Sequence, residues 1–234
     1  MIIDRLGQEI KKFDLPENRI NYQQFYKEKL AEPTGLRGGI LRDISNRCFK
    51  EMDDKSKNKV LKICDELLAA GERYFRFFAF DWASRFRGKY EKKDFARFER
   101  WLKTYVDDWG ACDGLCAGPI GAIVTQYPEL ARRTKKWGIS KNRWLRRAAA
   151  VSLIIPVRNG LLLKEVFKTA DMLLADRDDM VQKGYGWMLK EAGNKFPDEV
   201  FAYVMKNKVD MPRTSLRYAI EKYPEEKRRE AMAK

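Results

Sequence analysis

The chain has 234 residues, of which 44% are hydrophobic and 12% aromatic, a composition typical of a folded protein and not of a disordered one. Its 48 Lys and Arg outnumber 34 Asp and Glu, and the net charge of +14 favours a polyanionic partner, either nucleic acid or an anionic membrane face. Histidine is absent, which excludes Ser-His-Asp and Cys-His catalysis and His-based metal sites.

Apolar residues recur at helical spacing along almost the whole chain, and no segment alternates with a period of two. A short helix is predicted from Ile2, a second amphipathic segment over 17–31, and a glycine-rich joint at 35–39 before the next helix. Gly71 is expected to close a helix, and Ser140, Asp178 and Pro197 to mark helix starts. Other helices are predicted at 72–86, 94–105, 106–128, 129–136, 141–155, 163–174, 178–192, 198–207 and 213–222.

Short helices joined by short loops predict an all-α protein, a single-domain α-solenoid of antiparallel helix pairs over residues 1–234. No apolar run is long enough to span a bilayer, and Met1 to Asp4 begin no signal peptide, so we expect a soluble cytoplasmic protein. Cysteines at 48, 64, 112 and 116 match neither a metal site nor a secreted disulfide framework, and we interpret them as small buried thiols.

Residues 106–114 place Trp109 and Asp113 four residues apart, on one face of a helix. An aromatic ring beside a carboxylate suits a cationic guest, because the ring face attracts positive charge and the carboxylate neutralises it. Gly110 and Gly114 weaken a helix and allow another group to approach closely. Taken alone, such a stretch is more often a core tryptophan with an exposed or capping aspartate.

A second tryptophan, Trp187, lies beside Gly184 and Gly186 in another predicted helix. Two glycines are costly in a helix interior unless a backbone or a ligand comes close. A tight helix–helix contact explains them as well as a ligand does.

The window from Leu130 to Lys164 contains no acidic residue, although the chain has 34. Lys and Arg neutralise phosphates and release counterions, and the opposite charges of an ordinary solvated surface are missing here, so the window predicts a nucleic-acid interface. Its basic residues are Arg132, Arg133, Lys135, Lys136, Lys141, Arg143, Arg146, Arg147, Arg158 and Lys164, with Trp137 and Trp144 between them.

Taken in order, these motifs resemble the DNA alkylation-repair family of HEAT-like-repeat DNA glycosylases, the AlkD type. The matching pieces are a Gly-Leu-Arg joint at 35–37 leading to Arg42, the pair Trp109 and Asp113, Tyr-Pro-Glu-Leu at 127–130, Trp-Leu-Arg-Arg-Ala-Ala at 144–149 and Gly-Tyr-Gly-Trp at 184–187. The sequence departs from the family pattern at two sites. Gly38 and Gly39 replace a Thr-Pro or similar pair, and Lys190 stands where an Arg can occur, which keeps the charge but loses the guanidinium fork.

The resemblance implies a C-shaped solenoid of HEAT-like helix pairs whose basic concave face cups duplex DNA. It implies hydrolytic excision of positively charged N3- and N7-alkylated purines by a monofunctional enzyme, without flipping the lesion into a pocket. It assigns catalysis to Trp109, Asp113 and Trp187, and a phosphate contact to Arg147. We expect further DNA contacts from Arg146, Arg143, Lys141, Arg42 and Lys190. We also expect a monomer that uses no cofactor or metal and associates with the nucleoid when acting on DNA.

The implied chemistry agrees with the absence of histidine, because an alkylated purine carries its own positive charge and leaves without a general acid. Asp113 is expected to stabilise the charge that develops on the deoxyribose and to orient water, with the tryptophan faces adding cation–π attraction. Two alternatives are a non-catalytic relative that binds branched or distorted DNA and a scaffold for protein partners. The first need not keep all three residues, and the acid-free window argues against the second.

Overall fold

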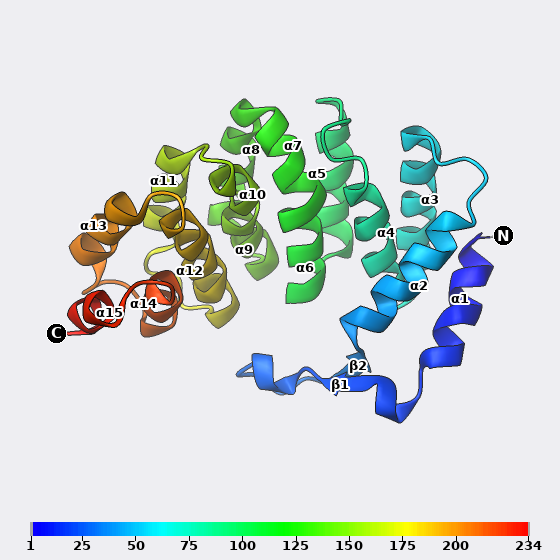
Figure 1. The fold of residues 1–234 in the computed structure, drawn as a ribbon, viewed down its shortest axis with the longest axis horizontal. Helices are drawn as coiled ribbons and strands as arrows, with labels where there is room; N and C mark the ends of the chain where they lie inside the picture. Colours follow the sequence, from blue (N-terminus) through cyan, green and yellow to red (C-terminus); the bar gives the residue numbers. More distant parts are fainter. Residues whose placement is uncertain (1, 234) are drawn as a thin grey trace. The chain divides into compact units, whose positions relative to one another are not determined.

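The structure, a computed structural model, describes residues 2–233; Met1 and Lys234, which the predicted single domain includes, lie outside the described residues. Packing divides the chain into two compact units, residues 1–86 and 87–234. Both units are built of helices and turns apart from one small sheet (Figure 1), which confirms the all-α prediction. No helix within the described residues combines the length and the apolar character needed to cross a bilayer.

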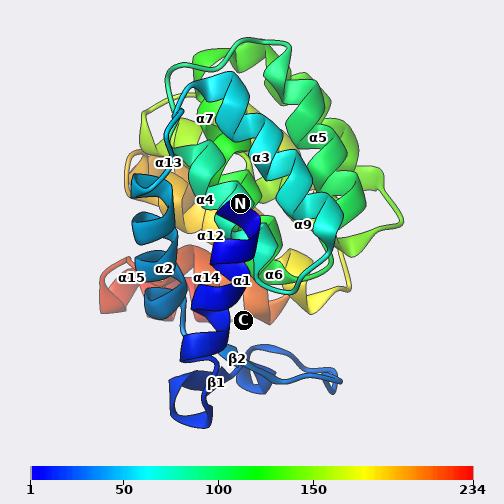
Figure 2. The same cartoon turned by 90° about the vertical axis from the view of Figure 1, so that its right-hand side faces the viewer.

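The first unit holds two helix pairs. Helices α1 and α2 lie side by side and antiparallel in both views (Figures 1 and 2), and α3 packs on α4. The indole Nε1 of Trp82 in α4 donates to Ser45 Oγ of α2 at 2.8 Å, so α4 is tied to α2 as well. The elements of the first unit are α1 (Ile2–Phe13), β1 (Arg19–Asn21), β2 (Thr34–Leu36), α2 (Gly38–Lys50), α3 (Lys57–Ala70) and α4 (Phe75–Ser84), with 3₁₀ turns at Pro16–Asn18 and Gln23–Phe25.

Segment 17–31 is not the helix that its apolar spacing predicts, and the expectation of no strands is also wrong here. Strands β1 and β2 pair antiparallel across this segment. Between them the Gln23 amide donates to Glu28 O at 2.7 Å and accepts from Leu30 N at 2.9 Å. Side chains that bond the nearby backbone offer it an alternative to the helix ladder. Hydrogen bonds of this kind determine the conformation of the segment, and they cannot be predicted from the spacing of its apolar residues.

The second unit follows the solenoid pattern, with helices succeeding one another in chain order (Figure 1). Helix α6 packs on α9, α9 on α12, and α12 on α14. The helices of the second unit are α5 (Asp94–Tyr105), α6 (Trp109–Leu115), α7 (Gly121–Gln126), α8 (Ala131–Lys135), α9 (Arg143–Val151), α10 (Ile154–Arg158), α11 (Leu163–Leu173), α12 (Asp179–Gly193), α13 (Pro197–Asn207), α14 (Arg213–Ile220) and α15 (Glu225–Met232). A π-turn at Cys116–Ile120 and 3₁₀ turns at Pro128–Leu130 and Lys136–Ile139 connect some of them.

The predicted helix 106–128 is broken between α6 and α7. Pro119 has no amide hydrogen to donate, and Gly118 leaves helical torsion angles (φ −117°, ψ −115°). The π-turn therefore kinks the chain here, as prolines and π-bulges do elsewhere.

Most predicted helix boundaries are confirmed within one or two residues. Gly71 ends α3 in a left-handed conformation, Asp178 caps α12, and Pro197 begins α13. The cap predicted at Ser140 is wrong, because Asn142 Oδ1 accepts from Trp144 N and α9 begins at Arg143.

Candidate active site

Helix α6 begins where Asp108 caps it, with Oδ1 accepting from Ala111 N at 2.7 Å. This start places Trp109 in the first turn and Asp113 one turn later, on the same face and both half-buried. Capping falls to Asp108, so Asp113 is free of that role and its carboxylate is available to another partner.

That partner is Arg147 of α9. The guanidinium donates Nε to Asp113 Oδ1 and Nη2 to Oδ2, each at 2.9 Å. Its third arm, Nη1, donates to the carbonyl of Met180 in the first turn of α12 at 2.5 Å. The side chains of Asp113 and Arg147 are 17% and 6% exposed, so the pair is largely shielded from water. One guanidinium therefore joins α6, α9 and α12.

Burial raises the pKa of the Asp113 carboxyl, and the charge and hydrogen bonds of Arg147 oppose that rise. Burial also acts against the charge of Arg147, but Asp113 outweighs it and raises the pKa of the guanidinium. Arg147 is therefore charged at neutral pH. A charged guanidinium with two bonds to one carboxylate favours the ionised form of Asp113 and so works against the rise caused by burial.

Gly184 lets α12 approach this pair. A Cβ at Gly184 would lie 3.0 Å from Arg147 Cγ and 3.4 Å from Arg147 Nη1, tighter than most real contacts. Trp187 follows three residues later and so projects from the same face of α12, one turn along. Arg147 thus bonds Asp113 on one side and lies close to Gly184 on the other, and Trp187 follows on the next turn of α12.

Gly186 serves a second helix contact. A Cβ there would lie 2.7 Å from Tyr218 Cβ and 2.9 Å from Ser215 O, both on α14. Both glycines beside Trp187 therefore occur at tight helix–helix contacts, one of the two explanations that the sequence left open.

Trp187 is half-buried, and a carboxylate fixes its indole. Nε1 donates to Glu191 Oε1 at 2.9 Å, one turn along α12. Arg158 of α10 pairs with the same carboxylate, with Nε 2.9 Å from Oε2 and Nη2 2.8 Å from Oε1. The hydrogen bond from Arg158 is the largest of the causes that lower the pKa of Glu191. Sequence reasoning missed Glu191, whose spacing of four residues from Trp187 was its one signal.

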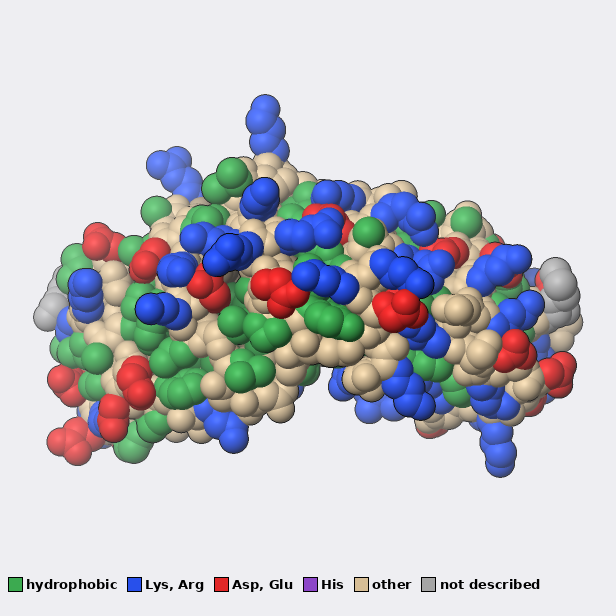
Figure 3. Space-filling view, turned by 90° about the horizontal axis from the view of Figure 1, so that it is seen from above, with side chains coloured by type: hydrophobic (Ala, Val, Ile, Leu, Met, Phe, Trp, Pro, Cys, Tyr) green, Lys and Arg blue, Asp and Glu red, His purple; other side chains and the backbone are tan. Residues whose placement is uncertain are grey.

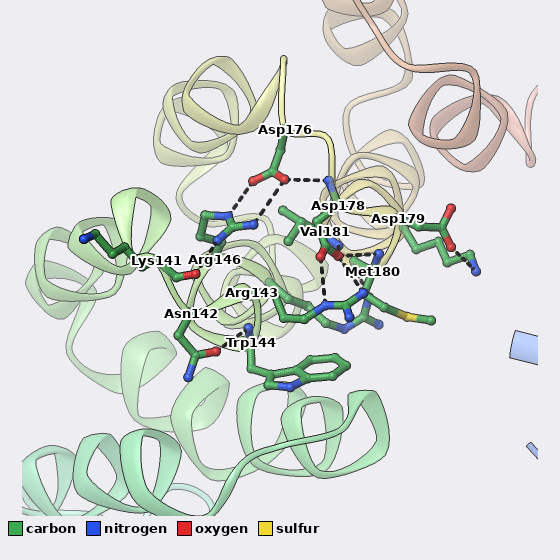
Figure 4. A network of polar contacts seen from close by, with 12 residues as sticks. Lys141, Asn142, Arg143, Trp144, Arg146, Asp176, Asp178, Asp179, Met180 and Val181 are labelled. Carbon is green, nitrogen blue, oxygen red and sulfur yellow. Dashed lines mark hydrogen bonds and ion pairs between the residues drawn. The ribbon is translucent and has the colours of Figure 1, made fainter. Parts of the chain in front are cut away.

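Carboxylates from outside the basic window pair with half of its ten cations. Figure 4 shows Arg143 beside Asp178 and Arg146 beside Asp176, with Nε–Oδ2 distances of 2.8 and 2.6 Å. The five pairs are Arg133–Glu99, Arg143–Asp178, Arg146–Asp176, Arg147–Asp113 and Arg158–Glu191. The inference that the basic window lacks opposite charges is therefore wrong for the folded protein, because other segments of the chain supply the carboxylates.

The unpaired remainder of the window is still basic. Within the described part of the chain, no ion pair forms at Arg132, Lys135, Lys136, Lys141 or Lys164. Figure 3 shows one face of the molecule, on which Lys and Arg side chains spread widely with Asp and Glu among them.

The other two predicted DNA contacts differ in their surroundings. Arg42 lies exposed on α2 of the first unit. Lys190 of α12 is 16% exposed and pairs with Glu221, the residue after α14, at 3.0 Å, with Nζ 5.7 Å from the centre of the Tyr218 ring.

A cavity of about 410 Å³ opens beside the start of α9. Glu99 sits in it and accepts from Trp137 Nε1 at 3.0 Å and from Arg133. The lining residues are Glu99, Lys103, Arg133, Lys136, Trp137, Ser140 and Leu145, so none of the predicted catalytic residues belongs to it.

The four cysteines are buried thiols, as predicted. Cys112 Sγ lies 3.6 Å from the carbonyl oxygen of Trp144, and burial raises the pKa of the Cys116 thiol well above its ordinary value. A buried thiol with a raised pKa is a poor nucleophile, so Cys116 has the properties of a packing residue.

Two solved structures illustrate the similarity of this fold to known proteins. One is described as a predicted DNA alkylation repair enzyme from Enterococcus faecalis, with a TM-score of 0.68 at 17% identity over 82% of this chain and 88% of that one. The other is the smu.31 protein of Streptococcus mutans UA159, with a TM-score of 0.58 at 17% identity over 95% and 98%. No curated protein matches the sequence.

The sequence profile of one family extends across both units. It is described as DNA alkylation repair enzyme and matches residues 6–223, which include α6, α9 and α12. The chain therefore belongs to the family of DNA alkylation repair enzymes.

Proposed function

We propose that this repair protein is a monofunctional DNA glycosylase, which excises positively charged N3- and N7-alkylated purines from duplex DNA by hydrolysis. The observation that carries the proposal is the Asp113–Arg147 pair, in which a guanidinium holds a carboxylate in place on a helix face one turn from Trp109. A charged purine leaves without a general acid, and this suits a chain that has no histidine.

Asp113 acts on the sugar. As the glycosidic bond breaks, positive charge develops on the deoxyribose, as in other glycoside hydrolyses. Arg147 uses one lone pair on each carboxylate oxygen, and each oxygen has a second one. A carboxylate already held in place stabilises the developing charge without reorganising, and it can orient the attacking water.

The tryptophans and the basic residues complete the assignment. Trp109 and Trp187 offer ring faces whose attraction for the sugar grows as its charge develops. Arg147 makes three of the five hydrogen bonds that a guanidinium can donate and can direct the others to a phosphate. The remaining DNA contacts are assigned to Arg146, Arg143, Lys141, Arg42 and Lys190, and the protein acts as a monomer.

A non-catalytic protein that binds branched or distorted DNA is the second candidate, and the same ion pair favours it. Arg147 offsets much of the charge of Asp113, and its bonds across three helices explain both residues as structural. This candidate requires that Asp113 contribute to folding and not to excision.

The Asp113→Asn variant separates the two candidates. We expect it to bind duplex DNA within a few-fold of the wild type and to lose on the order of 100- to 1,000-fold in single-turnover excision of 7-methylguanine, because a transition-state charge loses its partner. The matched control is Asp176→Asn, which removes another carboxylate paired with an arginine of α9. Equal excision rates for Asp113→Asn and the wild type would reject the catalytic role.

A further inference from the structure

We propose that Glu191 and Arg158 form a positioning pair, which holds the indole of Trp187 in one orientation for the excision step. The inference rests on the proposed function, because it concerns how one of the proposed catalytic residues is held. Neither residue is among the DNA contacts or catalytic groups assigned above.

The first link is between Trp187 and Glu191. An indole has a single hydrogen-bond donor, Nε1, and here it donates to Glu191 Oε1 at 2.9 Å. The two residues lie one turn apart on α12, so the bond spans the same face of the helix. Turning the ring over would break this bond, and the bond therefore selects one orientation of the ring.

The second link fixes the carboxylate from a different helix. Arg158 of α10 contacts both carboxylate oxygens of Glu191: Nε donates to Oε2 at 2.9 Å, and Nη2 forms an ion pair with Oε1 at 2.8 Å. Asn194 Nδ2 also donates to Oε2, at 3.3 Å. The Glu191 side chain is 13% exposed, and α10 packs on α12. A two-pronged arginine–carboxylate pair has defined geometry as well as strength, so the indole acceptor is held in place.

Orientation matters for what Trp187 is proposed to do. A cation is attracted to the face of an indole and not to its edge, so stabilisation of a charged sugar depends on how the ring is turned. Catalytic groups need neighbours that lock their side-chain conformation. Arg158 belongs to the basic window, and in this pair its charge holds Glu191 in place and does not bind a phosphate.

Single-turnover excision tests the pair with variants of Glu191. Glu191→Leu removes the acceptor and is expected to slow excision by up to about 100-fold, the cost of a misplaced group. Glu191→Gln keeps an amide oxygen that accepts from the indole and is expected to recover most of the rate. In a Trp187→Phe background, Glu191→Leu should add nothing further, because it acts only through the indole. Glu165→Leu, which removes an exposed ion pair on α11, is the matched control and should match the wild type.

Should Glu191→Leu fail to fold, Arg158→Ala gives the same test, since it leaves the carboxylate in place without its anchor. Arg158→Ala should slow excision but leave the salt dependence of DNA binding unchanged. A fall of about 0.9 in the slope of log affinity against log salt would make Arg158 a phosphate contact and overturn the assignment.

The indole N–H resonance of Trp187, identified by its loss in Trp187→Phe, reports the positioning without any activity. Glu191→Leu should shift this resonance and speed its hydrogen exchange, while Glu191→Gln should largely preserve it. An unmoved resonance, or a wild-type excision rate in Glu191→Leu beside an impaired Trp187→Phe, would overturn the inference. A wild-type rate in Trp187→Phe would instead reject the role of Trp187 in the proposed function, and the inference with it.

Discussion

Arg147 links residues that are far apart in the sequence. It bonds Asp113, 34 positions earlier, and the carbonyl of Met180, 33 positions later. Helical periodicity relates residues within one element, so the spacing of Trp109 and Asp113 could be predicted but their partner could not. The resemblance pointed to Arg147 as a phosphate contact, and the structure adds that it is the main partner of Asp113.

We expect Arg147→Ala to lower the free energy of unfolding by about 3–5 kcal/mol, because it leaves the Asp113 charge buried and unpaired. Urea unfolding followed by circular dichroism measures the loss. Combining Arg147→Ala with Asp113→Ala should recover part of it, since no unpaired charge then remains. A loss of less than about 1 kcal/mol would mean that water replaces the guanidinium and that the pair matters little to folding.

At the level of the elements, helix α12 is held by close contacts with two neighbouring helices. It packs on α9 at Gly184 and on α14 at Gly186, and it carries Trp187 and Glu191 on the next turns. Its boundaries were predicted closely, because Asp178 is a strong cap signal and the apolar period runs through it. The sequence could not show whether Gly184 and Gly186 serve a helix–helix contact or a ligand, because either one explains a glycine in a helix.

Gly186→Ala is expected to destabilise the protein by about 1–3 kcal/mol, since the new methyl group meets Ser215 backbone and Tyr218 Cβ under 3.0 Å away. The matched control is Gly39→Ala in α2, where a Cβ meets nothing within 4 Å. There the higher helix propensity of alanine should stabilise by up to about 1 kcal/mol. Thermal unfolding of both variants checks the signs, and a Gly186→Ala protein as stable as the wild type would contradict the close contact.

Elements were mispredicted where local bonds or composition outweigh periodicity. Segment 17–31 has helical apolar spacing, but Gln23 bonds the backbone around it and two strands form instead. Helix α15 went unpredicted because its sequence, EEKRREAM, is charged and buries only Ala231. In both cases the spacing of apolar residues does not determine the secondary structure that forms.

For the whole molecule, the net charge of +14 is the clearest sequence signal, and the structure shows which cations of the basic window have carboxylate partners. Half of its cations already have a carboxylate partner within 4 Å. A paired arginine divides its charge and its donors between its carboxylate partner and a phosphate, whereas an exposed lysine without an ion pair does not. Counting charges along the sequence therefore overestimates the electrostatic attraction for DNA.

Lys141→Ala is accordingly expected to reduce the slope of log affinity against log salt by about 0.9, the value for one phosphate contact. Arg143→Ala should reduce it less, because Arg143 is bound to Asp178. The control is Arg228→Ala, which removes an exposed cation of α15 outside the window. Fluorescence anisotropy at several salt concentrations measures the slopes, and equal decreases for Lys141→Ala and Arg228→Ala would contradict a localised interface.

The most direct test of the proposed glycosylase is whether the wild-type protein releases a base. Duplex DNA carrying 3-methyladenine and 7-methylguanine is incubated with the protein in the presence of a chelator, and free bases are quantified by mass spectrometry. The account predicts that free methylpurine accumulates with time and protein concentration, leaving intact abasic strands. If the protein binds this DNA but every methylpurine stays attached, the protein is no glycosylase for these bases and the DNA-binding candidate replaces the account.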